Sequence, residues 1–105
     1  MSAVVEIRTY ELLTGTGEEF HRLVIEESLP MLERWGVEVV AFGPSLDDQD
    51  SYYLIRAYPS LEELQRSQGA FYGSDEWRNG PREAIVSRIE RSSSVVLPAA
   101  GLSRP

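Results

Sequence analysis

The hydrophobic pattern of the chain contains four short β-like runs arranged around helical stretches. Strands are predicted at residues 4–13, 37–42, 51–58 and 92–97. The first run alternates with period two, which is typical of a strand whose two faces differ. One face carries Val5, Ile7 and Thr9, and the other carries Val4, Glu6, Arg8, Tyr10 and Leu12.

The first helical stretch is expected over residues 17–35. At about 100° per residue, its apolar stripe consists of Phe20, Val24, Met31 and Trp35. Thr16 followed by Glu19 has the spacing of a capping box, which would satisfy backbone donors at the start of the helix. Pro30 lies inside the stretch and has no N–H to donate, so the helix should kink or restart there before it ends at Gly36.

Two further helices are expected in the second half of the chain. Ser60 and Glu63 form another capping-box signal, for a helix that should extend to about residue 70. The segment 71–80 looks irregular, although Ser74 could cap a single turn there. Pro81 suits the first position of a third helix, which we expect to extend to residue 90.

The order strand, helix, strand, strand, helix, strand is the split βαβ connectivity of ferredoxin-like folds. We therefore predict an α+β protein with a four-stranded antiparallel sheet and an extra helix before the last strand. Right-handed crossovers would place both main helices on one side of this sheet. The 105 residues suffice for a single domain, which we place at residues 1–98. Residues 99–105 have no periodicity and are expected to form a loose tail.

The second and third predicted strands carry apolar side chains in both registers. The residues are Val37, Val39, Val40, Ala41, Phe42, Tyr53, Leu54, Ile55 and Tyr58. A sheet with one face in water should be polar on that face. Two such sheets packed face to face about a twofold axis would bury the spare apolar face, so we expect a homodimer. The alternative is a monomer in which the third helix or the tail covers that face.

Composition and charge argue against several classes of function. The net charge is −7, all ten basic residues are arginine, and the chain has no cysteine. These counts remove disulfides, a thiol nucleophile and a lysine Schiff base from consideration. An acidic chain without a basic stripe is a poor match for nucleic acid or for an anionic membrane surface. The strand pattern begins too early to leave room for a signal peptide, so we expect a cytoplasmic protein.

Four segments of the chain, taken in order, resemble the NIPSNAP family. They are Glu6-Ile7-Arg8-Thr9-Tyr10, Leu29-Pro30-Met31-Leu32, Tyr53-Leu54-Ile55-Arg56 and Phe71-Tyr72-Gly73-Ser74-Asp75-Glu76-Trp77. The resemblance spans about residues 4–97 and implies a ferredoxin-like protomer that pairs into a dimeric α/β barrel. It implies no particular reaction, because the wider superfamily includes cofactor-free oxygenases, lactone isomerases and haem-handling enzymes.

His21 is the only histidine, and it is the first candidate for a general base or proton shuttle. On the helical wheel His21 and Ser28 both fall near the apolar stripe, so both could face the sheet. The alternative is a solvated histidine at the edge of the helix. A role as a haem or metal ligand is disfavoured because no second histidine and no cysteine exists to converge with it. We expect no metal and no cofactor.

Arg8 and Arg56 should share one face of the sheet with Tyr10 and Glu6 if the first and third strands are neighbours. A buried arginine needs a partner, and a structural ion pair with Glu6 is one interpretation. The other interpretation is a guanidinium that binds a substrate carboxylate or enolate while Tyr10 donates a hydrogen bond. Both interpretations can hold together.

Tyr72 and Trp77 are candidates for a lid over a ligand pocket, because glycines flank them in the irregular segment. Packing against a partner subunit would explain them equally well. The first hypothesis for function is a homodimer that binds a small organic molecule, with cofactor-independent isomerase or oxygenase chemistry as its enzymatic form. The second is a non-catalytic interaction or ligand-sensing module. Phosphate-binding glycine loops, nucleophile elbows and zinc-helix motifs are absent from the sequence.

Overall fold

The computed structural model describes residues 3–102 and contains one four-stranded antiparallel sheet. The strands are β1 (Val4–Leu12), β2 (Glu38–Ser45), β3 (Asp48–Tyr58) and β4 (Ile89–Pro98). Their order in the sheet is β2-β3-β1-β4, so the first strand lies between the third and the last. This arrangement confirms the predicted α+β ferredoxin-like fold.

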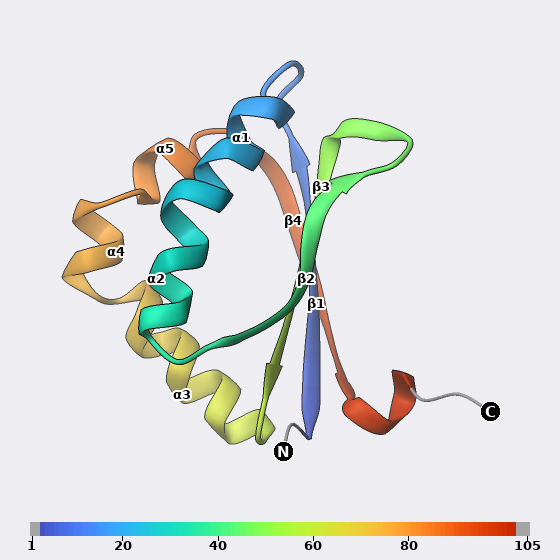
Figure 1. Ribbon diagram of the computed structural model, residues 1–105, viewed down its shortest axis with the longest axis vertical. Coiled ribbons are helices and arrows are strands. Elements are labelled where there is room, and N and C mark those ends of the chain that lie inside the picture. The colour runs from blue at the N-terminus through green and yellow to red at the C-terminus, as the bar shows by residue number, and fades with distance from the viewer. Residues whose placement is uncertain (1–2, 103–105) are drawn as a thin grey trace.

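Helices cover one face of the sheet, which Figure 1 shows nearly edge-on. They are α1 (Gly17–Leu23), α2 (Leu29–Arg34), α3 (Leu61–Tyr72), α4 (Asp75–Asn79) and α5 (Arg82–Val86), with a π-helical turn, η1 (Val24–Ser28), between α1 and α2. A 3-10 turn, η2 (Ala99–Leu102), lies on the other side of the sheet. We call the face without the long helices the bare face. No helix among residues 3–102 has the length and hydropathy needed to cross a membrane.

The first helix accommodates Pro30 through the π-helical turn. The backbone N–H of Leu29 donates to the carbonyl of Val24, five residues back, and Pro30 then falls in the first turn of α2. The wider turn tolerates a residue that has no N–H, and the α-helix restarts beside Pro30 as α2, in agreement with the expected kink or restart. The extra residue also shifts the helical phase. Consequently Phe20, Val24 and Met31 are buried as predicted, whereas Trp35 is 36% exposed.

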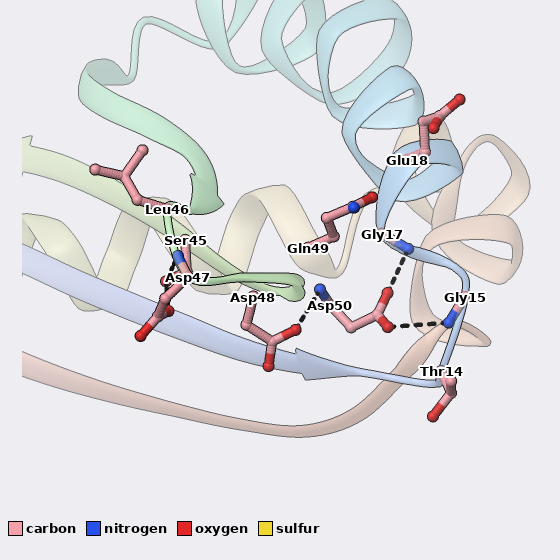
Figure 2. Close-up of a pocket in the computed structure, with 10 residues that line it drawn as sticks. All are labelled: Thr14, Gly15, Gly17, Glu18, Ser45, Leu46, Asp47, Asp48, Gln49 and Asp50. Carbon is pink, nitrogen blue, oxygen red and sulfur yellow. Dashed lines mark hydrogen bonds between the residues drawn. The ribbon is translucent and has the colours of Figure 1, made fainter.

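The start of α1 is capped by a residue from another part of the chain, and the predicted capping box at Thr16 is wrong. The Thr16 hydroxyl donates to the carbonyl of Leu13 and makes no cap bond. Instead the Asp50 carboxylate accepts from the backbone N–H of Gly15 at 3.0 Å and of Gly17 at 2.9 Å (Figure 2). The hairpin that joins β2 and β3 is thereby attached to the beginning of the first helix.

The strands β2 and β3 are longer than predicted and meet in a tight turn. Gly43 and Pro44, which read as a loop, lie inside β2, and Ser45 pairs directly with Asp48. Proline is tolerated here because β2 is an edge strand, where one row of backbone groups needs no partner. In Figure 1 the hairpin leans away from the helices, over the bare face.

The segment between α3 and β4 is more regular than predicted. The Ser60 cap is confirmed by a bond from the Glu63 N–H at 3.0 Å, and α3 continues to Tyr72. Ser74 caps α4 as expected, accepting from the N–H of Trp77. The third helix, α5, has only 5 residues, because β4 already begins at Ile89, opposite Leu12.

The core lies between the helices and the sheet. Its buried residues are Leu12, Phe20, Leu23, Val24, Met31, Leu32, Tyr52, Phe71, Trp77 and Ile85. The η2 turn falls within the stretch for which a loose tail was expected, and its first residue, Ala99, donates to the carbonyl of Ala3. The rest of the expected tail, residues 103–105, lies outside the described residues.

Candidate functional site

A buried cluster of charges lies between β1, β3 and α3 on the helix side of the sheet. Strand register places Glu6 directly opposite Arg56, and their side chains are only 2% and 0% exposed. Arg56 donates to Glu6 Oε1 from Nε at 3.0 Å and from Nη2 at 2.7 Å. Gln68 donates to the same oxygen at 2.8 Å, and Arg8 donates to Oε2 at 2.8 Å. Both oxygens of one carboxylate are therefore bound.

The cluster keeps Glu6 ionised and carries one unit of positive charge in excess. Burial alone would raise the pKa of Glu6. The charges of Arg56 and Arg8 and the hydrogen bonds from Gln68 and Arg56 together have the larger, opposite effect, so the pKa of Glu6 lies below its ordinary value. Two guanidinium groups thus face one carboxylate. Arg56 is completely buried, whereas the Arg8 side chain is 24% exposed. The excess charge is accordingly presented through Arg8.

Arg8 lies at the wall of an open pocket of about 370 Å³ between the sheet and the short helices α4 and α5. The polar and aromatic residues that line it are Arg8, Tyr10, Tyr72, Trp77, Arg82 and Ser92. Aliphatic side chains from α5 and β4 complete the wall. We call this space the Arg8 pocket. Ser92 enters it from β4 because it pairs with Tyr10 in the sheet register.

A small enclosed cavity of about 40 Å³ lies beside the Arg8 pocket. Tyr10, Tyr72, Trp77 and Ile85 line both spaces and therefore separate them. The other walls of the cavity are apolar residues of the core, together with Ser28 at the end of η1. The sequence indicated that Ser28 could face the sheet, and its position in the small cavity agrees with this. Ser28 therefore lies behind the aromatic residues that separate the cavity from the Arg8 pocket.

Two tyrosine hydroxyls are held close to the guanidinium groups. The Tyr72 hydroxyl accepts a hydrogen bond from Arg56 Nη1 at 2.8 Å, which leaves its own proton for another acceptor. The guanidinium carbons of Arg8 and Arg56 lie 5.9 and 5.7 Å from the centre of the Tyr72 ring, within cation–π range. Burial and the neighbouring Tyr72, opposed by Arg8, raise the pKa of Tyr10 to about 12. Tyr10 is therefore a hydrogen-bond donor at neutral pH.

The structure brings four of the seven sequence-predicted candidates together in the pocket, and it places His21, Ser28 and Arg56 outside it. Arg56 supports the pocket from behind through Glu6 and Tyr72. The Nδ1 atom of His21 lies 2.6 Å from the Tyr52 hydroxyl, and the His21 ring lines neither the pocket nor the cavity. Burial raises the pKa of Tyr52, so its hydroxyl stays protonated. Tyr52 lines the cavity and therefore connects His21 with it.

Three residues of the site were not predicted from the sequence. Gln68 lies four positions after the buried Leu64 on α3, and this helical spacing could have indicated that it faces the sheet. Ser92 could have been inferred from the alternation along the last strand. No sequence pattern indicated Arg82, because its position in the pocket depends on where the short helix α5 packs.

A second hollow, of about 610 Å³, lies between the start of α1 and the β2–β3 hairpin. Figure 2 shows that its acidic lining includes Asp47, Asp48 and Asp50, and that Asp50 is engaged in capping α1. Within residues 3–102 no group of three or more histidine, cysteine, aspartate or glutamate side chains is arranged to hold a metal ion. We therefore interpret this hollow as a structural junction.

Comparison with known proteins identifies the fold. No family model and no curated protein matches the chain. An uncharacterized NIPSNAP-like domain protein from Burkholderia xenovorans is 19% identical, with a TM-score of 0.86 over 99% of this chain and 90% of that one. A NIPSNAP family protein of unknown function from Agrobacterium tumefaciens is 20% identical, with a TM-score of 0.82 over 92% and 87%. A putative antibiotic biosynthesis monooxygenase from Nitrosomonas europaea is 17% identical, with a TM-score of 0.68 over 90% and 95%. These likenesses confirm the NIPSNAP-type, ferredoxin-like fold.

Proposed function

We propose that the chain is a small-molecule-binding protein whose ligand occupies the Arg8 pocket. The observation that carries this proposal is an aromatic-walled pocket of about 370 Å³ backed by a fully bonded charge cluster. Ligand pockets in proteins usually hold about 300–1,000 Å³ and combine apolar walls with a few fixed polar groups. Arg8 and Tyr72 are both anchored from behind, so their orientation is set before a ligand arrives.

The enzymatic form of the proposal is cofactor-independent chemistry of the isomerase or oxygenase type. Arg8 and Tyr10 are the groups placed to stabilise negative charge that develops on a ligand oxygen. A role for His21 in proton transfer would be indirect, because His21 does not line the cavity and contacts Tyr52, which does. The similar fold of the antibiotic biosynthesis monooxygenase named above supports oxygenase chemistry as one member of this class.

A non-catalytic ligand-sensing module is the second candidate, and one observation favours it. The single histidine of the chain lies outside the pocket, so no group with an ordinary pKa near 7 lines it among the described residues. In a ligand-sensing module of this kind, the pocket binds its ligand without transforming it. We also propose a cytoplasmic location, with which a sequence free of cysteine is compatible.

Blocking the pocket provides the test of ligand binding. Ser92→Trp should fill the Arg8 pocket from β4, because Ser92 is an exposed residue at its mouth. Fragments that bind the unmodified protein in a fluorine NMR screen should lose at least tenfold in affinity with this variant. Ser87→Trp is the matched control, since Ser87 is exposed and does not line the pocket. Fragments that bind Ser92→Trp unchanged, or a screen without binders, would contradict the proposal.

We also propose that the protein is a homodimer formed through the bare face. Strand register places Ile7 between Ile55 and Val95 on this face, and Val95 is 63% exposed. Polar groups of β1 and β4 on the same face are already paired, with Thr9 bonded to Ser93 at 3.0 Å and Arg91 to Glu11 at 2.7 Å. Burying these paired groups in an interface would therefore leave neither Glu11 nor Arg91 without a partner.

The shape of the bare face favours a second copy of the chain as the partner. Leu46 is fully exposed at the tip of the overhanging hairpin. Beside it lies an open hollow of about 910 Å³ lined by residues of β1, β3 and the hairpin. Each copy would thus offer both a projecting apolar side chain and a recess, which is the self-complementarity that a twofold interface requires.

A single charge on the bare face should separate the subunits. We expect Val95→Asp to be a monomer at micromolar concentration, because the single twofold interface would bury two unpaired carboxylates, one from each subunit. Sedimentation velocity distinguishes the two states. Leu61→Asp is the matched control, since Leu61 is an exposed leucine at the start of α3 on the helix side. A monomeric unmodified protein, or a dimer that tolerates Val95→Asp, would refute this interface.

A further inference from the structure

The Arg8 pocket is positive in a protein that is strongly negative. The chain carries a net charge of −7, yet the charged residues that line the pocket within the described range are Arg8 and Arg82, with no carboxylate among them. The one carboxylate behind the wall, Glu6, is shared between Arg8 and Arg56. Local charge in the pocket is therefore opposite in sign to that of the molecule.

Arg8 is held in place while part of its guanidinium stays available. Its hydrogen bonds to Glu6 and Gln68 both start from Nη2. Arginine has five N–H donors in a planar fork, so Nε and Nη1 retain donors for a further acceptor. The side chain is only 24% exposed, and a charge in such a half-buried position interacts strongly with an oppositely charged group.

From this arrangement we infer that the ligand of the Arg8 pocket is a small monocarboxylate with a flat apolar body, and that Arg8 is its counter-ion. The inference rests on the proposed ligand-binding function and specifies its substrate class. Either Nε or Nη1 of Arg8 can donate to one carboxylate oxygen, and the Tyr10 and Tyr72 hydroxyls supply donors for the other. The ring of Trp77 provides an apolar surface for the body of the ligand.

The charge count favours one negative charge on the ligand. The cluster of Arg8, Arg56 and Glu6 has an excess of one positive charge. Arg82 adds little to this excess, because it is largely exposed and lies 3.9 Å from the carboxylate of Glu83. A phosphate group, with a charge near −2, would leave part of its charge uncompensated in the pocket. The aromatic walls also suit an organic body better than a hydrated dianion.

Paired probes of equal shape test the inference directly. Benzoate and phenylacetate would be compared with the uncharged benzamide and phenylacetamide by isothermal titration calorimetry at neutral pH, with the purified full chain. We expect each carboxylate to bind at least tenfold more tightly than its amide. This ratio should fall to about twofold or less in Arg8→Gln. Arg8→Lys should keep an intermediate ratio, because a point charge replaces the planar fork.

Arg78→Gln is the matched control for net charge, since Arg78 is an exposed residue of α4 outside the pocket lining. This variant should keep the full carboxylate preference. Amides that bind as tightly as carboxylates would overturn the charge inference and leave the ligand pocket standing. A carboxylate preference that survives Arg8→Gln would overturn the role of Arg8. Failure of all four probes to bind would overturn the inference together with the pocket on which it rests. The comparison of probes on the unmodified protein does not depend on the folding of any variant.

Discussion

Glu6→Gln is expected to destabilise the folded protein by about 3–5 kcal/mol, the range found when one partner of a buried ion pair is removed. The substitution preserves the shape of the side chain and removes the charge that neutralises Arg56, which has no exposed surface. Arg8, Arg56 and Gln68 would all lose a charged acceptor. Urea denaturation at pH 7, followed by far-ultraviolet circular dichroism, measures the change in the free energy of unfolding.

Two variants make this expectation specific to the buried pair. Glu19→Gln removes an exposed carboxylate that pairs with Arg22, and its effect on the unfolding midpoint should be small. The double variant Glu6→Leu with Arg56→Met leaves no unpaired charge at the fully buried position 56 and should recover part of the lost stability, although Arg8 still lacks its carboxylate partner. If Glu6→Gln were no less stable than the unmodified protein, the cluster would not have the role described for it.

The same cluster makes the free energy of unfolding depend on pH in the acid range. The folded-state pKa of Glu6 lies below the ordinary value of 4.5, so the folded state binds fewer protons than the unfolded state in this range. The contribution of Glu6 is therefore fully present above about pH 4.5 and is lost as the pH falls through the folded-state pKa. The double variant should show a shallower loss of stability between neutral pH and this acid range than the unmodified protein.

Gly17→Ala is the second substitution for which we expect a large effect, a loss of about 3 kcal/mol, at the upper end of the cost of overpacking. A Cβ at this position would run into the carbonyl oxygen of Gln49 and come within 2.7 Å of its carbonyl carbon. Those atoms belong to the backbone of β3 and cannot move without displacing the hairpin. The new methyl group would also press on the Asp50 carboxylate, at 2.9 Å, and so disturb the cap of α1.

The chemically identical change at Gly69 provides the control. Gly69 lies inside α3, and a Cβ there would meet nothing within 4 Å. Alanine should stabilise the helix by roughly 0.5–1 kcal/mol, because it loses less conformational entropy on folding than glycine. Thermal and urea unfolding of both variants should therefore show effects of opposite sign. A Gly17→Ala variant as stable as the unmodified protein would mean that the hairpin can move away from α1 at little cost.

The sequence was sufficient to predict the fold and the pairing of Glu6 with an arginine of the same sheet face, because both follow from strand order and period-two alternation. It could not predict the cap of α1. Thr16 satisfied the local rule, but Asp50 competes for the same backbone donors from a hairpin whose position is set by tertiary packing. The length of β2 was underestimated for a related reason. Gly43-Pro44 indicates a loop in most contexts, and only the edge position of the strand makes it compatible with a sheet.

The candidate site was predictable where it depends on strand faces and unpredictable where it depends on helix placement. Arg8 and Tyr10 share a face by alternation, and Arg56 joins them because β1 and β3 are neighbours, as the expected strand order requires. His21 was placed near the sheet correctly, but its distance from the pocket depends on the packing of α1, which a helical wheel does not contain. Tyr72 and Trp77 reach the pocket from α3 and α4, in a segment whose short helices are specified by caps as much as by hydrophobic periodicity.

The position of β1 between β3 and β4 has a consequence for how the protein folds. The pairing of Tyr10 with Ser92 joins the two ends of the chain, and it completes the wall of the Arg8 pocket. Contacts of such long sequence separation contribute to a high contact order, which is associated with slower folding. The pocket is thus assembled only when the last strand has docked, so a nascent chain without β4 has no finished site. A molecule bound there would stabilise only the complete fold, by mass action.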